Sequence, residues 1–214
     1  NLKTIYFLNI LKSLKQKIVL TFHGIDIQID EKINYGYRLN KKYEKKLKGA
    51  IKNIDIFFSI SKNIYNDIIN LGIAKDKIVI VPNSVDIEKF SKIKNIDTKI
   101  EDKIKLITVT RFAKDKKGLD LIPDIARILY SKKINFEWSL VGYNSRKIRD
   151  LSDMKKYDNF FKYFDNIENL EEEIFPHTNL IKIFKENHLY INLSRIESFG
   201  VTIIESLAAN LPVI

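Results

Sequence analysis

The sequence predicts an α/β protein with two domains, each built on a parallel sheet. Short apolar runs typical of buried strands alternate along the chain with stretches that carry apolar residues at helical spacing. Strands that alternate with helices favour parallel sheets with helical crossover connections. A polar, poorly periodic stretch at residues 84–102 separates two such series. We therefore predict one domain over residues 1–83, a linker over 84–102 and a second domain over 103–214.

The first series has three strand-like runs, at residues 17–22, 55–60 and 77–81. Residues 38–52 show a helical period with lysines on the opposite face. Ser61 is suited to cap the helix that follows the second run, and Gly72 to end it.

The second series has predicted strands at residues 104–110, 136–141, 160–164 and 189–193. Helical spacing predicts a helix over residues 119–129 and another over 179–185. A further helix and a turn follow the last of these strands, and residues 211–214 read as the start of one more strand.

Composition narrows the class of protein. Hydrophobic residues make up 45% of the 214 residues, which is enough to build a core and excludes a disordered chain. No apolar run reaches the roughly 20 residues that span a bilayer, and no signal peptide is visible, so we expect a cytoplasmic protein. The chain has no cysteine, which excludes disulfides and cysteine zinc sites.

The net charge of +10 is compatible with nucleic acid, an acidic membrane surface or anionic substrates as partners. The chain is rich in Lys, Asn and Ile throughout, which favours a general compositional bias over a binding patch. The lysine-rich helix at residues 38–52 leaves two interpretations open. One is a solvated face above a packed core, which we favour, and the other is peripheral contact with anionic lipid at the inner face of the membrane.

The most informative segment is Ser194–Ile214, with the sequence SRIESFGVTIIESLAANLPVI. It places Glu197 in a loop after a strand, Phe199 and Gly200 at the start of a helix, and Glu205 inside that helix. Open α/β sheets bind ligands at the carboxyl ends of their strands. A helix N-terminus at that edge offers free N–H groups and a positive dipole end to a phosphate, and Gly200 would let the backbone approach it closely.

This segment resembles the donor-site signature of family-4 retaining glycosyltransferases, which have the GT-B fold of two facing Rossmann-like domains. The family pattern is a Glu, a Phe-Gly pair, a second Glu eight positions after the first, and then Ala-x-Gly-x-Pro-Val. The chain matches both acids, Phe199-Gly200 and Pro212-Val213. It departs at Asn210, where glycine is usual, and Asn is the next-best residue for a left-handed helix cap. The resemblance implies a GT-B-like fold with two Rossmann-type domains, both incomplete.

Two further segments fit the same family. Arg111 follows the first strand of the second series, and Lys116-Lys117-Gly118 lies just beyond it. Arg provides a planar fork and Lys a point charge, which together suit a diphosphate. The family carries Lys-Gly at this place, so Gly118 sets the register and we favour Lys117 over Lys116; a solvated basic loop is the alternative. His23, at the end of the first strand, matches a family histidine that lies beside the sugar at the interdomain cleft. A purely structural role for His23 is the alternative.

The resemblance implies transfer of a sugar from a UDP- or GDP-linked donor to a hydroxyl of a glycan or lipid-linked acceptor. It also implies retention of the anomeric configuration, in cell-surface polysaccharide or glycan synthesis. We expect no cofactor and no metal, since no Asp-x-Asp motif occurs. The expected donor-binding residues are Arg111, Lys117, Ser198, Phe199, Gly200 and Glu205, and the expected catalytic residues are His23 and Glu197.

Two alternative functions stay open. One is a GT-B-type nucleotide-sugar 2-epimerase, which shares the nucleotide site. The other is a non-catalytic basic module that binds nucleic acid or membrane and would not need Glu197 or Glu205. No RNA-recognition or helix-turn-helix signature is evident, so we expect no nucleic-acid partner. The chain begins with Asn and ends where a strand has barely begun, so we also expect a fragment that lacks the start of the first domain and the end of the second and is inactive alone.

Overall fold

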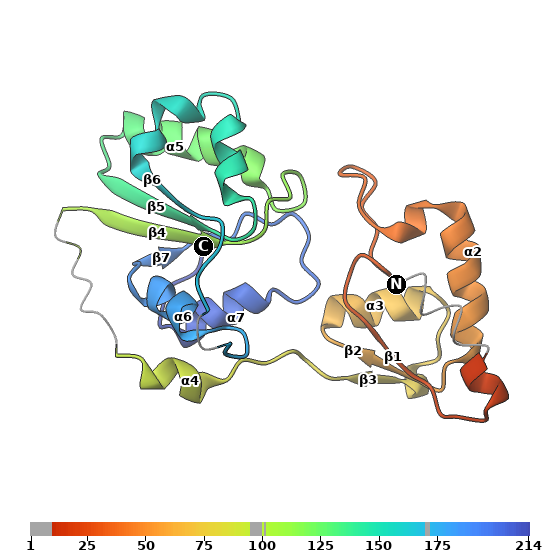
Figure 1. Ribbon diagram of the computed structural model, residues 1–214. Helices are drawn as coiled ribbons and strands as arrows, with labels where there is room; N and C mark the ends of the chain where they lie inside the picture. The colour runs from red at the N-terminus through yellow and green to blue at the C-terminus, as the bar shows by residue number, and fades with distance from the viewer. Residues whose placement is uncertain (1–9, 95–99, 101, 170–171) are drawn as a thin grey trace. The chain divides into compact units, whose positions relative to one another are not determined.

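The computed structural model of the chain describes residues 10–94, 100, 102–169 and 172–214. It divides between Asn83 and Ser84 into two compact units, of which the second runs to the end of the chain (Figure 1). Residues 197–199 are grouped with the first unit. Each unit has its own parallel sheet, which confirms the predicted α/β class.

The first unit contains a sheet whose described strands are β1 (Val19–Phe22), β2 (Ile56–Ser59) and β3 (Ile78–Ile80), in that order and all parallel. Helices α2 (Lys41–Ala50) and α3 (Lys62–Asn70) provide the crossover connections. Short 3-10 helices lie at η1 (Tyr37–Leu39), η2 (Ile51–Asn53) and η3 (Lys75–Lys77). The three predicted strands are confirmed, each with trimmed ends.

Both helices of the first unit begin at capping side chains. Asn40 Oδ1 accepts hydrogen bonds from two backbone N–H groups at the start of α2. Ser61 Oγ accepts the N–H of Ile64, so its predicted role as the cap of α3 is confirmed. Gly72 follows the end of α3 with a φ of 86°, the left-handed conformation that favours glycine. The apolar faces of both helices pack on the sheet in one core, which includes Phe22, Leu47, Phe57, Ile64 and Ile68.

The second unit contains a parallel sheet in the order β6-β5-β4-β7 across its described strands. The strands are β4 (Ile104–Val109), β5 (Phe136–Val141), β6 (Phe161–Phe164) and β7 (Leu189–Tyr190). The helices are α4 (Ile87–Lys92), α5 (Ile122–Ser131), α6 (Thr178–Lys185) and α7 (Val201–Ala208). Short 3-10 helices lie at η4 (Leu119–Leu121), η5 (Ser145–Asp150), η6 (Met154–Lys156) and η7 (Asp158–Phe160).

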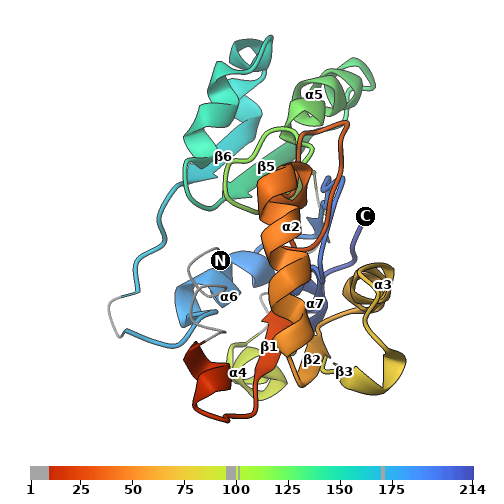
Figure 2. The ribbon, with the colours of Figure 1, turned by 90° about the vertical axis from the view of Figure 1, so that its right-hand side faces the viewer.

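Helices cover both faces of the second sheet. Helix α5 lies on one face, and α6 and α7 lie on the other (Figures 1 and 2). Strand side chains alternate between the two resulting cores, as the pleat requires. Leu106 and Trp138 belong to the core that includes residues of α5, whereas Ile107 and Val109 belong to the core that includes Phe184 of α6. The sheet is thus buried on both faces, which explains why its strands read as continuous apolar runs.

The structure differs from the sequence-based expectations at two places. Within the segment predicted as a linker, Ile87–Lys92 forms α4, and Phe90 is buried in the core of the second unit. Helix α4 is too short to show a helical period in the sequence. Residues 95–99 and 101 of the predicted linker lie outside the described residues. The last predicted strand is regular only over Leu189–Tyr190, although the N–H of Ile191 still donates to Ile107 O at 2.8 Å.

Candidate functional site

In the second unit, the predicted donor-binding residues lie at the carboxyl ends of neighbouring strands. Arg111 follows the end of β4, while Gly200 and Glu205 belong to the segment after β7 that forms α7. Strands β4 and β7 are adjacent in the sheet and parallel, so the loops after them leave the same edge. This edge is where open parallel sheets bind ligands.

The loop between β4 and η4, residues 110–118, carries both predicted cations and is called the basic loop below. Arg111 is exposed, and Lys117 is partly buried with its N–H bonded to Ala113 O at 2.8 Å. Gly118 has a φ of 60°, and a Cβ at this position would overlap the carbonyl oxygen of Leu193. Only glycine fits so close to another backbone in this conformation. The loop is therefore packed directly against the segment that follows β7.

The start of α7 gives the second element of the site. Gly200, buried and left-handed with a φ of 81°, immediately precedes the helix. The first N–H groups of a helix have no partner within it and form the positive end of its dipole. Thr202 in this first turn accepts a hydrogen bond from the hydroxyl of Tyr190 on β7 at 2.7 Å, which ties the helix start to the sheet.

Glu205 is the most unusual group of the second unit. Glu205 is only 1% exposed to solvent, and its Oε2 atom has no hydrogen-bond partner in the described part of the chain. Burial raises the pKa of this carboxyl from 4.5 to about 7. A buried, unpartnered carboxylate oxygen is costly and rare, and it calls for a specific explanation. A ligand that donates hydrogen bonds would remove the cost.

An ion pair that the sequence does not reveal lies beside the basic loop. Arg195 and Asp120 form two parallel hydrogen bonds of 2.6 Å, Nη1 to Oδ1 and Nη2 to Oδ2. No local sequence signal could have found this pair, because the partners are 75 positions apart.

The remaining predicted residues, His23 and residues 197–199, are grouped with the first unit. His23 is exposed directly after β1, where the N–H groups of His23 and Gly24 donate to the carboxylate of Asp26. Gly24 has a φ of 130°, so the glycine of this predicted pair is conformationally required. Residues 197–199 are partly buried in the loop between β7 and α7. The structure thus places Arg111, Lys117, Gly200 and Glu205 on the segments that follow two adjacent parallel strands. The roles assigned to all the predicted site residues stay predictions.

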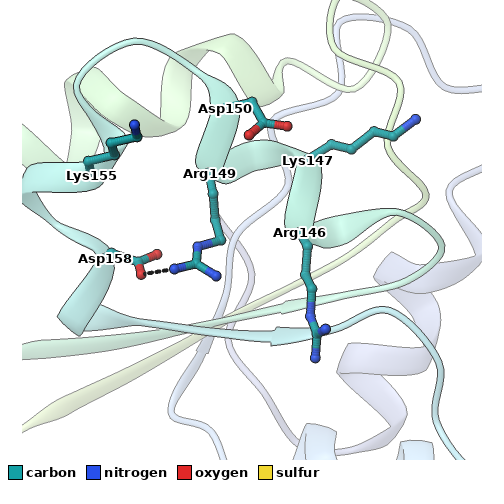
Figure 3. A pocket seen from close by; sticks show the side chains of 6 residues that line it. All are labelled: Arg146, Lys147, Arg149, Asp150, Lys155 and Asp158. Carbon is teal, nitrogen blue, oxygen red and sulfur yellow. Dashed lines mark hydrogen bonds and ion pairs between the residues drawn. The ribbon is translucent and has the colours of Figure 1, made fainter.

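A basic hollow of about 590 Å³ opens on the segment that follows β5, a stretch for which the sequence predicts no site. Figure 3 shows its lining, Arg146, Lys147, Arg149, Asp150, Lys155 and Asp158. Arg149 pairs with Asp158 at 2.6 Å, and the other cationic side chains point away from one another (Figure 3). None of the predicted donor-binding residues lines this hollow.

The two units, each with a helix-covered parallel sheet, place the chain in the GT-B class of folds. The chain belongs to the glycosyl transferases group 1 family, whose model matches residues 86–214. A second model, Glycosyltransferase Family 4, matches residues 4–89. The predicted membership of the family-4 (group 1) glycosyltransferases and the GT-B fold are confirmed.

Several relatives share sequence over much of the chain. An uncharacterised 41.2 kDa protein in the cps region of Klebsiella pneumoniae is 26% identical over 99% of this chain and 55% of its own length. The amylovoran biosynthesis glycosyltransferase AmsK of Erwinia amylovora is 25% identical over 95% of this chain and 48% of its own. The alpha-monoglucosyldiacylglycerol synthase of Acholeplasma laidlawii is 25% identical over 79% and 44%. The chain spans about half the length of these curated relatives.

Solved structures support the fold. Anabaena Alr3699/HepE in complex with UDP has a TM-score of 0.70 and 13% identity over 98% of this chain and 56% of its own. WaaG, a glycosyltransferase involved in lipopolysaccharide biosynthesis, has a TM-score of 0.69 and 17% identity over 96% and 60%. Within the described ranges, no helix combines the length and the apolar character that crossing a membrane requires.

Proposed function

We propose that the full-length protein transfers a sugar from a UDP- or GDP-linked donor to a hydroxyl acceptor with retention of configuration. We propose further that it acts in the synthesis of a cell-surface polysaccharide or glycan. Family membership supports the transfer. The names of two relatives, one in a cps region and one in amylovoran biosynthesis, support the polysaccharide role. Structural neighbours solved with UDP and with UDP-glucose support the class of donor.

The observation that carries the proposal is the buried carboxylate of Glu205, whose Oε2 atom has no hydrogen-bond partner among the residues that the structure describes. Ribose presents two adjacent hydroxyl donors, and a carboxylate offers only acceptors. Hydrogen bonds from these hydroxyls would satisfy the orphaned oxygen and favour its ionised form. We therefore assign the ribose of the donor nucleotide to Glu205.

The diphosphate would be held by the basic loop and the start of α7. The bond that breaks joins the anomeric carbon to a diphosphate oxygen, and negative charge grows on the leaving diphosphate as it breaks. Arg111, Lys117 and the first N–H groups of α7 would stabilise that charge. Loss of one such preorganised contact typically lowers the rate by about 10²–10³-fold. Gly200 is left-handed and has no Cβ, so a diphosphate could approach the backbone at the start of α7 closely.

The sugar side of the reaction is assigned to Glu197 and His23, with Ser198 and Phe199 on the donor-binding loop. Glu197 would hold the sugar hydroxyls or the positive charge that develops at the anomeric carbon. His23 follows a strand end and is exposed, so its ring is accessible to a substrate. These assignments rest on the sequence resemblance.

We propose a glycan or lipid-linked acceptor, and a peripheral contact with an anionic membrane on the cytoplasmic side. The relative named alpha-monoglucosyldiacylglycerol synthase supports a lipid-linked acceptor. Lys41, Lys42, Lys45 and Lys48 form an exposed basic face on α2, opposite its buried residues. Co-sedimentation with vesicles rich in anionic lipid should be lost when these four lysines become Gln. Equal sedimentation of both proteins would contradict it.

The central test is nucleotide binding by the full-length protein. Calorimetry with UDP and GDP should show binding of one of them, and Glu205→Ala should weaken it about ten- to a hundredfold, the value of a charge-assisted hydrogen bond. The matched control is Glu186→Ala, because Glu186 is exposed at the end of α6. Unchanged affinity in Glu205→Ala would contradict the ribose assignment. Product analysis with labelled nucleotide-sugars would then separate transfer from 2-epimerisation, and NMR of the product would show its anomeric configuration.

A further inference from the structure

The contacts of Arg195 join the basic loop to the segment that follows β7 at several points. Its guanidinium makes the two 2.6 Å hydrogen bonds to the carboxylate of Asp120. The same Nη1 atom donates to Asp115 O at 2.8 Å, and the backbone N–H of Arg195 donates to Lys116 O at 3.0 Å. Two consecutive carbonyls of the basic loop are thus held by one residue.

We propose that Arg195 is a positioning residue that sets the location of the Lys116–Lys117 cations for a nucleoside diphosphate. The inference rests on the proposed function, since it assigns the diphosphate to this loop. It concerns a residue that does not itself touch the ligand and acts through the backbone of the loop.

The geometry favours positioning over stability as the role of this pair. The side chains of Arg195 and Asp120 are 32% and 30% exposed, and partly exposed ion pairs contribute little to stability. What a bidentate Arg–carboxylate pair does provide is direction, because the planar fork fixes both partners. Here the guanidinium makes a third contact, to the carbonyl oxygen of Asp115 in the basic loop that carries Lys116 and Lys117.

A second contact joins the same two segments independently. Gly118, the last residue of the basic loop, packs so closely on Leu193 that a Cβ would overlap the Leu193 carbonyl oxygen. The loop is therefore fixed at its end by Gly118 and at its middle by Arg195. Without the Arg195 side chain, the loop would keep the Gly118 contact and the bond from the backbone N–H of residue 195 to Lys116 O. It would lose the hydrogen bond to Asp115 O and the link to Asp120.

The consequence is a selective loss of phosphate binding. If Arg195→Gln lets the loop move, the lysine contact to the diphosphate weakens, while the nucleoside contacts at Glu205 are unchanged. We expect affinity for UDP, or for GDP if that is the nucleotide bound, to fall about tenfold or more, with less than about twofold change for the matching nucleoside. Arg195→Lys should give an intermediate loss, because Lys keeps the charge and lacks the fork.

A double-mutant cycle tests whether Arg195 and Asp120 act as a unit. Arg195→Gln, Asp120→Asn and the double variant should weaken the nucleoside diphosphate to a similar extent, since removing either partner already breaks the pair. The control is Arg149→Gln, which breaks another Arg–Asp pair of 2.6 Å in the same unit and should leave both affinities unchanged. Calorimetry of the full-length protein provides all the affinities.

The outcomes separate the inference from the proposed function. If wild type binds neither UDP nor GDP, the proposed function fails. If wild type binds one of them and Arg195→Gln binds it equally well, only the positioning role is overturned. Equal losses for nucleoside and nucleoside diphosphate would also overturn it, because they point to general damage to the fold. Additive effects in the cycle would overturn the claim that Arg195 and Asp120 act as a unit.

Discussion

Replacing Glu205 by Gln should stabilise the ligand-free protein, and the gain should grow with pH. Burial raises the folded-state pKa of this carboxyl from 4.5 to about 7. The folded state therefore holds the proton more tightly than the unfolded state, and ionisation favours unfolding. The contribution is fully present below pH 4.5, and it is lost as the pH rises through 7. The glutamine variant has no such group and escapes this loss.

The size of the effect follows from the shift. A rise of about 2.5 units, from 4.5 to about 7, corresponds to roughly 3 kcal/mol at pH values above 7, at about 1.4 kcal/mol per unit. Close to 1 kcal/mol of this is already lost at about pH 5, where the unfolded carboxyl is mostly ionised. The difference in free energy of unfolding between variant and wild type should thus increase by about 2 kcal/mol from pH 5 to pH 8.

Urea unfolding at both pH values, with linear extrapolation to water, measures this difference. Glu186→Gln is the control, because Glu186 is exposed at the end of α6. Saturating nucleotide at pH 8 should stabilise wild type more than Glu205→Gln, since binding to the folded state adds to stability and the variant binds more weakly. A gap of the same size at pH 5 and pH 8, or a variant less stable than wild type at pH 8, would refute the reasoning. Either result would mean that the carboxylate already has a partner.

Three further predictions concern the basic loop. Arg111→Ala should weaken UDP or GDP by about ten- to a hundredfold and the bare nucleoside by less than about twofold, and calorimetry showing equal losses would indicate a structural role. Lys117→Ala should be more damaging to diphosphate affinity than Lys116→Ala, and the reverse order would place the register one residue earlier. Gly118→Ala should destabilise the protein by about 1–3 kcal/mol in urea unfolding, because the left-handed backbone and the neighbouring carbonyl exclude a Cβ. Its control is Gly49→Ala in α2, where a Cβ meets nothing within 4 Å and a gain of about 0.5–1 kcal/mol is expected.

The strands of the second unit could be predicted because its sheet is buried between helices on both faces. Strands such as Phe136–Val141 are then apolar on both faces and stand out as short continuous runs. Left-handed positions were also predictable where residue type restricts the backbone, as at Asn210, which has a φ of 63°. Helix α4 could not be predicted, because about one and a half turns around Phe90 are too short to show a helical period. Its helical state depends on the burial of Phe90 in the core that includes Phe184 of α6.

The site could be predicted only as far as residue types and their order along the chain. The sequence places an acid at Glu205 in a helix after a strand, but a period of apolar residues does not say which helix positions are sealed from water. Burial and the lack of a partner for Oε2 depend on how α7 packs on the sheet, and they turn an ordinary helical glutamate into a group that a ligand can satisfy. The role of Arg195 likewise could not be predicted from the sequence. Its partner Asp120 is distant in sequence, so the proposed role of Arg195 rests on the fork it forms with Asp120 and on the loop carbonyl it holds. Residue identity therefore points to the chemistry of a phosphate and ribose site, whereas the tertiary contacts decide which atoms are free to bind and which hold the others in place.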